Sequence, residues 1–346
     1  MKKVTPVTSW ITVNRRCNFR CKWCYAEDTD YKKEDSMSFD AAKELVEISV
    51  EAGVKKILFI GGEPTLWDPL FKINEFCSDL DIQTVIVTNG LRFGEDKFWK
   101  KFRENPTDKI GLSLKAHTER KLKQVAGVSR FKTMRKGFER IFDYFEGVTP
   151  SITYNSFYVD DLPEMVKFLS DCGAKRVKID FCSTVFEDGK AQNKYMVNPH
   201  QIVDNILKDY DKMENAVEEG LVFEMMLPFC LWPKDFIMKL KERGQLLSVC
   251  HVLRKKGLVF DTDGSVLMCN ALFDAPIGKK DEDFSNGEEL VDWLNSEKIR
   301  QYYQKIRRYP SEKCADCLWY SECGGGCPLR WALYKPENIV DPVKSL

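Results

Sequence analysis

Short apolar runs rich in β-branched residues alternate with longer segments of helical spacing through the first half of the chain. Helical spacing is clearest over 38–53, where Ser38 or Asp40 would cap the helix and Gly53 would end it, and over 131–147. The apolar runs predict six buried strands, at 8–13, 55–60, 83–88, 109–114, 151–157 and 176–181. Repeated strand–helix–strand order indicates a parallel sheet, either a partial (β/α) barrel or a doubly wound sheet. In a barrel, chemistry takes place at the carboxyl ends of the strands.

The pattern changes in the second half. Residues 198–247 are helical apart from one strand-like run at 221–227, and 258–269 predict a hairpin around Asp263-Gly264. Two helical stretches over 288–308 precede a Cys- and Gly-rich segment at 314–327. We therefore expect an α/β fold with a partial (β/α)6 TIM-like barrel at 1–225. A bridging segment at 226–249 and a small Cys-rich α+β domain at 250–346 would follow.

Composition narrows the class of protein. The 346 residues are 43% hydrophobic, and 53 Lys and Arg balance 53 Asp and Glu. This is the composition of a folded chain, and its zero net charge argues against a nucleic-acid partner. No apolar run approaches the roughly 18 residues of a membrane span, and the first residues lack the apolar stretch of a signal peptide. We expect a cytoplasmic protein without a membrane partner.

The 13 cysteines carry the candidate chemistry, because clustered cysteines in a reducing compartment indicate metal binding or redox work. Cys17, Cys21 and Cys24 have C-x3-C-x2-C spacing in the loop after the first predicted strand. Three thiolates on one loop can hold three irons of a [4Fe–4S] cluster and leave the fourth iron open. A structural zinc site with a distant fourth ligand is the alternative.

A second motif supports the interpretation of the triplet as an iron–sulfur site. Gly61-Gly62-Glu63-Pro64 follows the second predicted strand. With the cysteine triplet it resembles the radical S-adenosylmethionine (radical SAM) superfamily. The resemblance implies that Gly61, Gly62, Glu63 and Pro64 bind the methionine amino group of SAM, since glycines permit close approach and a carboxylate pairs with an ammonium.

Weaker marks follow from the same resemblance. Many relatives have Ser-Leu-Asp-Gly where this chain reads Ser113-Leu114-Lys115-Ala116, which leaves the role of position 115 open. Each further candidate also has a purely structural alternative as a turn or strand residue. The candidates are Asn89 for the ribose, Ser113 for the methionine carboxylate, Asn155 for a further SAM contact and Tyr25 near the adenine.

The C-terminal cysteines form a third pattern. Cys250 is followed by Gly264 and Cys269, and then by Cys314-x2-Cys317-x5-Cys323-x3-Cys327. This resembles the SPASM extension of radical SAM enzymes at six of seven positions. The resemblance implies a first auxiliary cluster on Cys250, Cys269 and Cys327, and a second on Cys314, Cys317 and Cys323. A zinc site is the alternative, because C-x2-C pairs also serve zinc.

The missing seventh cysteine leaves ligands to be assigned. Asp341, or next Glu337, is the candidate replacement in the second cluster, which would otherwise have an open iron. Cys230 is available as the remaining ligand of the first cluster, with a buried apolar thiol as the alternative. Near the sixth strand, Cys182 could donate a hydrogen atom, and Asp180 or Glu187 could act as an acid or base. A packed thiol and salt-bridged acids are their structural alternatives.

The resemblance implies a radical SAM oxidoreductase that cleaves SAM reductively to a 5′-deoxyadenosyl radical. The substrate would be a side chain of a ribosomally made precursor peptide, and the product an oxidative thioether, C–C or C–O cross-link. An anaerobic sulfatase-maturating enzyme, which forms formylglycine, is the runner-up, and a non-catalytic Fe–S electron carrier or zinc scaffold is the alternative of another class. Expected partners are the peptide or protein substrate and a reductant such as flavodoxin or ferredoxin, with a separate peptide-recognition protein as a further candidate.

Overall fold

Six consecutive parallel strands form the centre of the molecule. The computed structural model describes residues 3–26, 35–187, 190–192, 194–224, 227–247, 250, 254–306 and 310–334. Neighbouring strands in the sequence are hydrogen-bonded neighbours in the sheet. They are β1 (Thr8–Asn14), β2 (Lys56–Gly61), β3 (Gln83–Thr88), β4 (Lys109–Leu114), β5 (Ser151–Tyr154) and β6 (Val177–Phe181). The expected partial barrel is confirmed.

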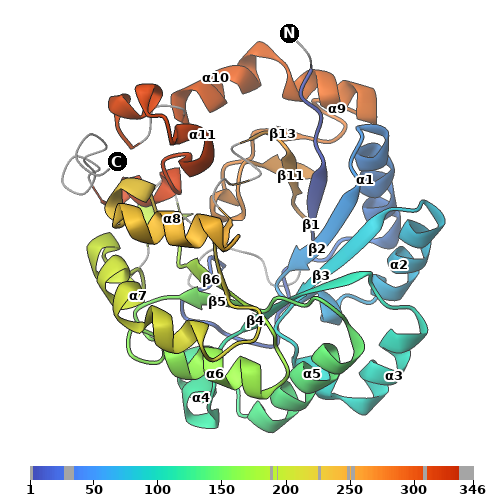
Figure 1. Cartoon of the computed structure of the whole chain (residues 1–346). Coiled ribbons are helices and arrows are strands. Elements are labelled where there is room, and N and C mark those ends of the chain that lie inside the picture. Colours follow the sequence, from blue (N-terminus) through green and yellow to red (C-terminus); the bar gives the residue numbers. More distant parts are fainter. Residues whose placement is uncertain are drawn as a thin grey trace.

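Helices cover the outer face of these strands, as Figure 1 shows. The Ser38 side chain accepts from the Ala41 amide and caps the first of them, as expected. The apolar side of each helix packs on the strands, because both surfaces are removed from water. The helices are α1 (Phe39–Glu51), α2 (Leu70–Asp79), α3 (Asp96–Glu104), α4 (Glu119–Ala126), α5 (Phe131–Tyr144), α6 (Leu162–Asp171) and α7 (Pro199–Glu214).

The sheet continues beyond both edges of the six-stranded barrel. At the β6 edge, β9 (Leu221–Glu224) pairs in parallel with β6, and β10 (Leu246–Leu247) pairs with β9. At the other edge, β11 (Gly257–Phe260) pairs in parallel with β1 and turns into β12 (Ser265–Leu267), which pairs with β13 (Gly278–Lys279). The expected hairpin is therefore present. Its first strand, β11, belongs to the barrel sheet because it pairs with β1.

The last helices, α9 to α11, lie on the side between the two sheet edges, in orange and red in Figure 1. The amide of Gly287, at the start of α9 (Gly287–Leu294), donates to Glu51 Oε2 at 2.9 Å and fixes α9 against α1. A small hairpin, β7 (Val185–Glu187) with β8 (Lys190–Gln192), follows β6. The other helices are α8 (Lys234–Glu242), α10 (Glu297–Ile306) and α11 (Tyr320–Cys323).

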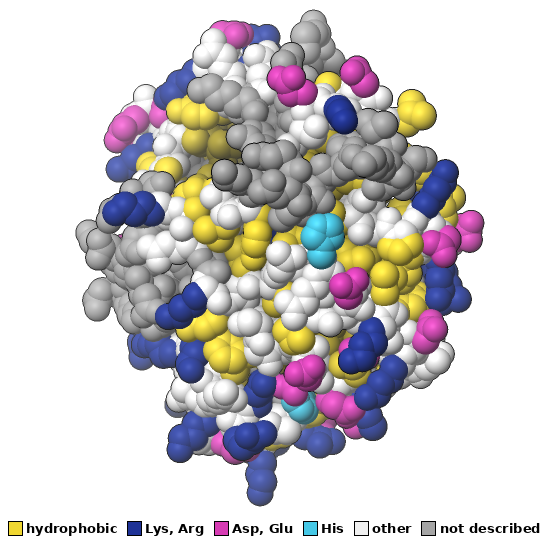
Figure 2. All heavy atoms as spheres, turned by 90° about the vertical axis from the view of Figure 1, so that its left-hand side faces the viewer, with side chains coloured by type: hydrophobic (Ala, Val, Ile, Leu, Met, Phe, Trp, Pro, Cys, Tyr) yellow, Lys and Arg dark blue, Asp and Glu magenta, His cyan; other side chains and the backbone are white. Residues whose placement is uncertain are grey.

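The surface carries acidic, basic and hydrophobic side chains side by side. On the face in Figure 2, acidic and basic side chains occur together, with hydrophobic side chains showing between them. Of the helices in the described part of the chain, none has the length and apolar character needed to cross a membrane.

Candidate active site

The cysteine triplet lies on the loop after β1. Two buried aromatic side chains between the thiols, Phe19 and Trp23, anchor this loop in the core. The amides of Arg20 and Lys22 donate to the carbonyls of Ala126 and Val125 at the end of α4, at 2.9 and 3.0 Å. The three half-buried thiols thus sit at the carboxyl end of the barrel strands.

The two glycines after β2 allow the backbone to approach the root of this loop. A Cβ on Gly61, whose φ is +150°, would lie 2.1 Å from the Asn14 carbonyl oxygen, and one on Gly62 would lie 2.3 Å from that of Arg16. The amide of Gly62 donates to Asn14 O at 2.9 Å, and that of Glu63 to Arg16 O at 2.8 Å. The motif therefore holds the cysteine loop in place, a role beyond the ligand contact expected from the sequence.

The Glu63 side chain is 1% exposed and accepts hydrogen bonds from neutral donors. Its Oε1 accepts from the Thr65 amide (3.2 Å), the Thr65 hydroxyl and the Thr88 hydroxyl (both 2.7 Å). Burial raises the pKa of this carboxyl, although these donors act against the shift. Burial also raises the pKa of the Cys17 thiol to about 12, and the charge of Glu63 adds to it. The motif and the triplet therefore lie within electrostatic range of each other.

Asn89, after β3, joins the two motifs. Its amide donates to Glu63 Oε2 at 2.9 Å, and its Nδ2 donates to Oδ1 of Asn18 in the cysteine loop at 2.7 Å. Asn14 Nδ2 donates to the Glu63 carbonyl at 3.1 Å, whereas its buried Oδ1 has no hydrogen-bond partner within the described ranges. An acceptor left open in this position suits a ligand with an amino group.

Lys115 is a site residue whose role the sequence left open. Its Nζ donates to Ser113 Oγ at 2.7 Å, and its charge lowers the pKa values of both Cys17 and Asp180, against the larger effect of burial. Its position in the sequence could have identified it, because Lys115 stands where many radical SAM relatives have an aspartate. Ser113 and Lys115 put an alcohol and a cation beside the triplet.

Two of the weaker candidates have local partners. Asn155 follows β5 rather than lying in it, and ends the strand earlier than predicted. Its Nδ2 donates to Thr153 O and its Oδ1 accepts from the Phe157 amide, both at 2.9 Å, as its structural alternative implies. The Tyr25 ring lies 6.4 Å from that of Phe273, which links the triplet to the segment after Cys269.

Asp180 and Cys182 lie at the end of β6. Asp180 is 18% exposed and 3.7 Å from Lys178, so it has the salt bridge named as its structural alternative. Cys182 is buried, and its carbonyl accepts from Arg330 Nη2 at 2.9 Å. Burial raises the pKa of Tyr158, with smaller contributions from Cys21 and Cys182. Cys182 therefore lies between the triplet and the C-terminal segment. The Glu187 side chain is outside the described residues.

The C-terminal thiols form two neighbourhoods. Burial raises the pKa of Cys269 to about 12, and the thiols of Cys327 and Cys250 contribute. Cys327 Sγ also lies 3.6 Å from Ser183 Oγ, beside Cys182. These are the three residues expected to share a first cluster, and they reach the same end of the barrel as the triplet.

Cys230 belongs to the other neighbourhood. Burial raises the pKa of its thiol to about 12, and Cys323, Cys314 and Cys317 each add to the shift. From the sequence, Cys230 was expected to complete the first set, whereas its neighbours in the structure are the cysteines of the second set. Distance along the chain does not show which C-terminal loop this segment contacts. Asp341 and Glu337 lie outside the described residues.

Arg330 lies beside Cys182 and Cys327. It is 0% exposed, and among the described residues its Nε and Nη1 have no hydrogen-bond partner. Burial lowers its pKa, while the thiols of Cys327 and Cys182 act in the opposite direction. A buried guanidinium with open donors fits an anionic group at Cys327. In the described part of the chain, no three His, Cys, Asp or Glu side chains converge closely enough to hold a metal ion as they stand.

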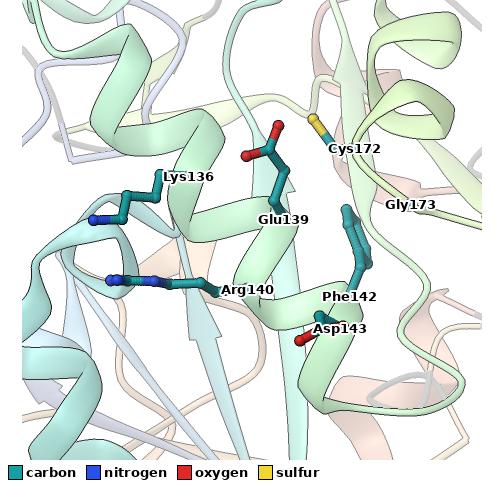
Figure 3. A pocket seen from close by; sticks show the side chains of 7 residues that line it. All are labelled: Lys136, Glu139, Arg140, Phe142, Asp143, Cys172 and Gly173. Atoms are coloured by element: carbon teal, nitrogen blue, oxygen red, sulfur yellow. The ribbon is translucent and has the colours of Figure 1, made fainter.

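A surface hollow lies elsewhere, on the outer helical layer (Figure 3). It is lined by Lys136, Glu139 and Arg140 of α5 and by Cys172 and Gly173 after α6. Lys136 and Arg140 both pair with Asp96, so their positive charges are partly compensated. The hollow contains none of the candidate site residues.

Comparison with known proteins identifies the domain. Residues 11–169 match the family model described as the radical SAM superfamily. The chain carries a radical SAM domain. The match of residues 11–169 implies a [4Fe–4S] cluster and SAM, for which the triplet, Glu63 and Lys115 supply fitting groups.

Relatives of this radical SAM chain differ in how much of it they cover. It is 28% identical over 176 residues to a probable GTP 3′,8-cyclase of Methanococcus maripaludis, which covers 49% of the chain and 57% of the cyclase. It is 25% identical over 353 residues to an Fe-coproporphyrin III synthase of Methanosarcina barkeri, over 95% of the chain and 84% of the synthase. The chain thus spans little more than half the length of the cyclase.

Two solved structures share the fold over nearly the whole chain. Streptococcus suis SuiB bound to precursor peptide SuiA superposes with a TM-score of 0.70 at 18% identity, covering 99% of this chain and 76% of SuiB. Native anSMEcpe with bound AdoMet gives a TM-score of 0.68 at 19% identity, covering 93% of this chain and 89% of anSMEcpe.

Proposed function

We propose that this radical SAM protein is a peptide maturase that forms an oxidative cross-link in a ribosomally made precursor, with the C-terminal cysteines serving auxiliary iron–sulfur clusters. One observation carries the proposal. Cys17 of the triplet lies within electrostatic range of Glu63 and Lys115 at the carboxyl end of the barrel. A second set of thiols reaches the same end through Ser183 and Cys327.

The residues around the triplet would hold SAM by its methionine end. Glu63 Oε2 accepts one hydrogen bond, from the Asn89 amide, and can accept a second. Together with Asn14 Oδ1, it would accept hydrogen bonds from the ammonium group of SAM. Lys115 and Ser113 would take the carboxylate. When bound, the cluster and SAM supply one electron for C–S cleavage and a 5′-deoxyadenosyl radical that abstracts hydrogen.

Polar side chains on neighbouring strands would position the substrate. Ser113 pairs in register with Ser151, and Thr153 with Asp180, and all four are only partly buried. Lys178 pairs with both Asp180 and Glu224. This polar strip can hydrogen-bond the backbone amides of a peptide and hold one C–H bond towards the triplet.

The auxiliary sites would make the net reaction an oxidation. A cross-link removes two hydrogens from the peptide. The 5′-deoxyadenosyl radical would take one of them as a hydrogen atom and become 5′-deoxyadenosine. The other would leave as a proton and an electron. Arg330, buried beside Cys327 and Cys182, would stabilise a negatively charged cluster that accepts this electron. A flavodoxin or ferredoxin would supply the electron that starts each turnover.

The peptide assignment is supported by what the solved structures hold. SuiB is bound to a precursor peptide, and anSMEcpe has also been solved with a Cp18Cys peptide. A second candidate activity is the formation of an iron coproporphyrin from an iron porphyrin precursor, favoured by the alignment with the Fe-coproporphyrin III synthase over 95% of this chain.

The test incubates anaerobically reconstituted enzyme, SAM and reductant with small peptides encoded beside its gene, and in parallel with an iron porphyrin precursor of Fe-coproporphyrin III. The expected result is a peptide that has lost two hydrogens, with one 5′-deoxyadenosine formed for each product. Fragmentation would separate a cross-link, which joins two residues, from a formylglycine on one. Conversion of the porphyrin alone would replace the peptide assignment. Clusters or zinc without any SAM cleavage would establish the carrier or scaffold alternative.

A further inference from the structure

The segment around Cys230 packs directly against the loop of the last cysteines. Cys230 is the middle residue of a short helical turn, Phe229–Leu231. The Phe229 amide donates to Cys323 Sγ at 3.3 Å, so the residue next to Cys230 already contacts one of these thiols. The Phe229 ring also lies 6.4 Å from that of Trp319, edge to face.

The helix after this turn fixes the contact. Lys241 of α8 pairs with Glu322 of α11 at 2.8 Å, and its ammonium lies 4.9 Å from the centre of the Trp319 ring. Two separate points, the turn and α8, therefore hold the bridging segment against α11. The position of Cys230 is set by this packing and not by its own side chain.

The C-terminal loop that carries Cys314, Cys317 and Cys323 is itself ordered by backbone hydrogen bonds. The Cys317 amide donates to Cys314 O at 3.3 Å, and the Cys323 amide to Trp319 O at 2.8 Å. Cys314 and Cys323 are buried, while Cys317 and Cys230 are half-buried. Burial raises the pKa of the Cys230 thiol to about 12, and Cys323, Cys314 and Cys317 lie near enough to raise it further. Although no three of these thiols converge closely enough to hold a metal ion as they stand, four cysteines on two segments packed against each other supply the donor set of an iron–sulfur cluster.

We propose that Cys230 is the fourth ligand of the iron–sulfur site formed by Cys314, Cys317 and Cys323. The proposal rests on the assignment of auxiliary clusters above, but not on the substrate. This site is then closed by four thiolates and has no open iron, which suits electron transfer. It needs no carboxylate from Asp341. The set of Cys250, Cys269 and Cys327 keeps three thiolates and is the one that faces the barrel.

The test uses the full chain with Cys17→Ala, Cys21→Ala and Cys24→Ala, which removes the N-terminal cluster from the count. Cys230→Ala is added to this background, with Cys323→Ala as the comparator and Cys77→Ala as the matched control. Cys77 is a fully buried thiol on α2, outside the cysteine neighbourhoods. After anaerobic reconstitution, iron, sulfide and zinc are counted, and [3Fe–4S] signals are quantified by electron paramagnetic resonance after mild oxidation.

Cys230→Ala is expected to match Cys323→Ala. Each should lose about four irons per chain or gain one extra [3Fe–4S] signal, since an iron without a thiolate leaves on oxidation. Cys230→Ser should keep the cluster with a shifted spectrum, which separates ligand loss from misfolding. Iron content and spectra of Cys230→Ala equal to those of Cys77→Ala would overturn the proposal, as would a single zinc in this site. Neither readout depends on SAM cleavage, so failure of the proposed function would be seen separately.

Discussion

The side-chain amide of Asn89 donates to Asn18 Oδ1 over 2.7 Å, across 71 residues of sequence. Because the Asn89 backbone amide also donates to Glu63, one residue after β3 couples the cysteine loop to the glycine–glutamate motif. The two motifs of the site are therefore held as one unit.

Asn89→Ala should loosen the cysteine loop while leaving the backbone bond to Glu63 intact. Loss of a residue that orients a ligand loop typically costs 10–100-fold in metal affinity. We expect iron release to a chelator to be faster by about this factor. Asn74→Ala, which removes a buried asparagine from α2, is the control. Equal release rates in the two variants would show that the Asn89–Asn18 bond does not support the loop.

Lys115→Met should weaken SAM binding without loss of iron. A hydrogen bond to a charged group contributes about 1.5–3 kcal/mol, so we expect a roughly 10- to 150-fold higher Kd for SAM. Lys115→Arg should recover part of the loss. Lys109→Met, at the exposed start of the same strand, should bind SAM like the wild type. Equilibrium dialysis measures all four proteins, and an unchanged Kd in Lys115→Met would remove this residue from the SAM site.

Glu63 makes the stability of the apoprotein depend on pH. Burial raises its pKa in the folded state, so the unfolded chain loses this proton at lower pH than the folded one. Stability relative to Glu63→Gln should therefore fall as pH rises above the ordinary glutamate range, and level off above the folded pKa. Denaturant unfolding of both apoproteins across pH measures this difference. A difference that stays constant or grows in favour of the wild type would contradict the assigned direction.

Arg330→Met should make the auxiliary cluster that we propose at Cys327 harder to reduce, because a buried positive charge favours the more negative reduced state. A single charge close to a buried cluster changes its reduction potential by on the order of 50 mV or more. The potential should therefore fall by about this amount in Arg330→Met. Arg330→Lys should restore part of the shift. Redox titration followed by electron paramagnetic resonance provides the measurement. Identical potentials in all three proteins would place Arg330 away from the cluster.

Local patterns in the sequence were enough to predict the barrel. Alternating apolar runs located the six strands, and Ser38 marked the start of α1 because its side chain satisfies a free amide there. β5 was predicted three residues too long, because Asn155 turns the chain with two side-chain hydrogen bonds that a pattern of apolar residues does not reveal.

Contacts between distant segments could not be predicted in this way. The pairing of β11 with β1 depends on backbone groups, which every residue possesses, and so it leaves no local signature. The same holds for Cys230, whose neighbours are set by packing of α8 on α11, and for Arg330, whose burial beside Cys182 and Cys327 joins three separate segments. The motifs identified the chemistry, while the fold determined which residues share a site.

Reductive cleavage of SAM tests the central claim most directly. The wild type and the variant with Cys17→Ala, Cys21→Ala and Cys24→Ala are reconstituted anaerobically and incubated with SAM and a strong reductant. 5′-Deoxyadenosine is then measured against the iron content of each protein. The account predicts 5′-deoxyadenosine from the wild type and none from the variant, which should keep the iron of its C-terminal sites. Equal amounts from both proteins, or none from an iron-loaded wild type, would contradict it.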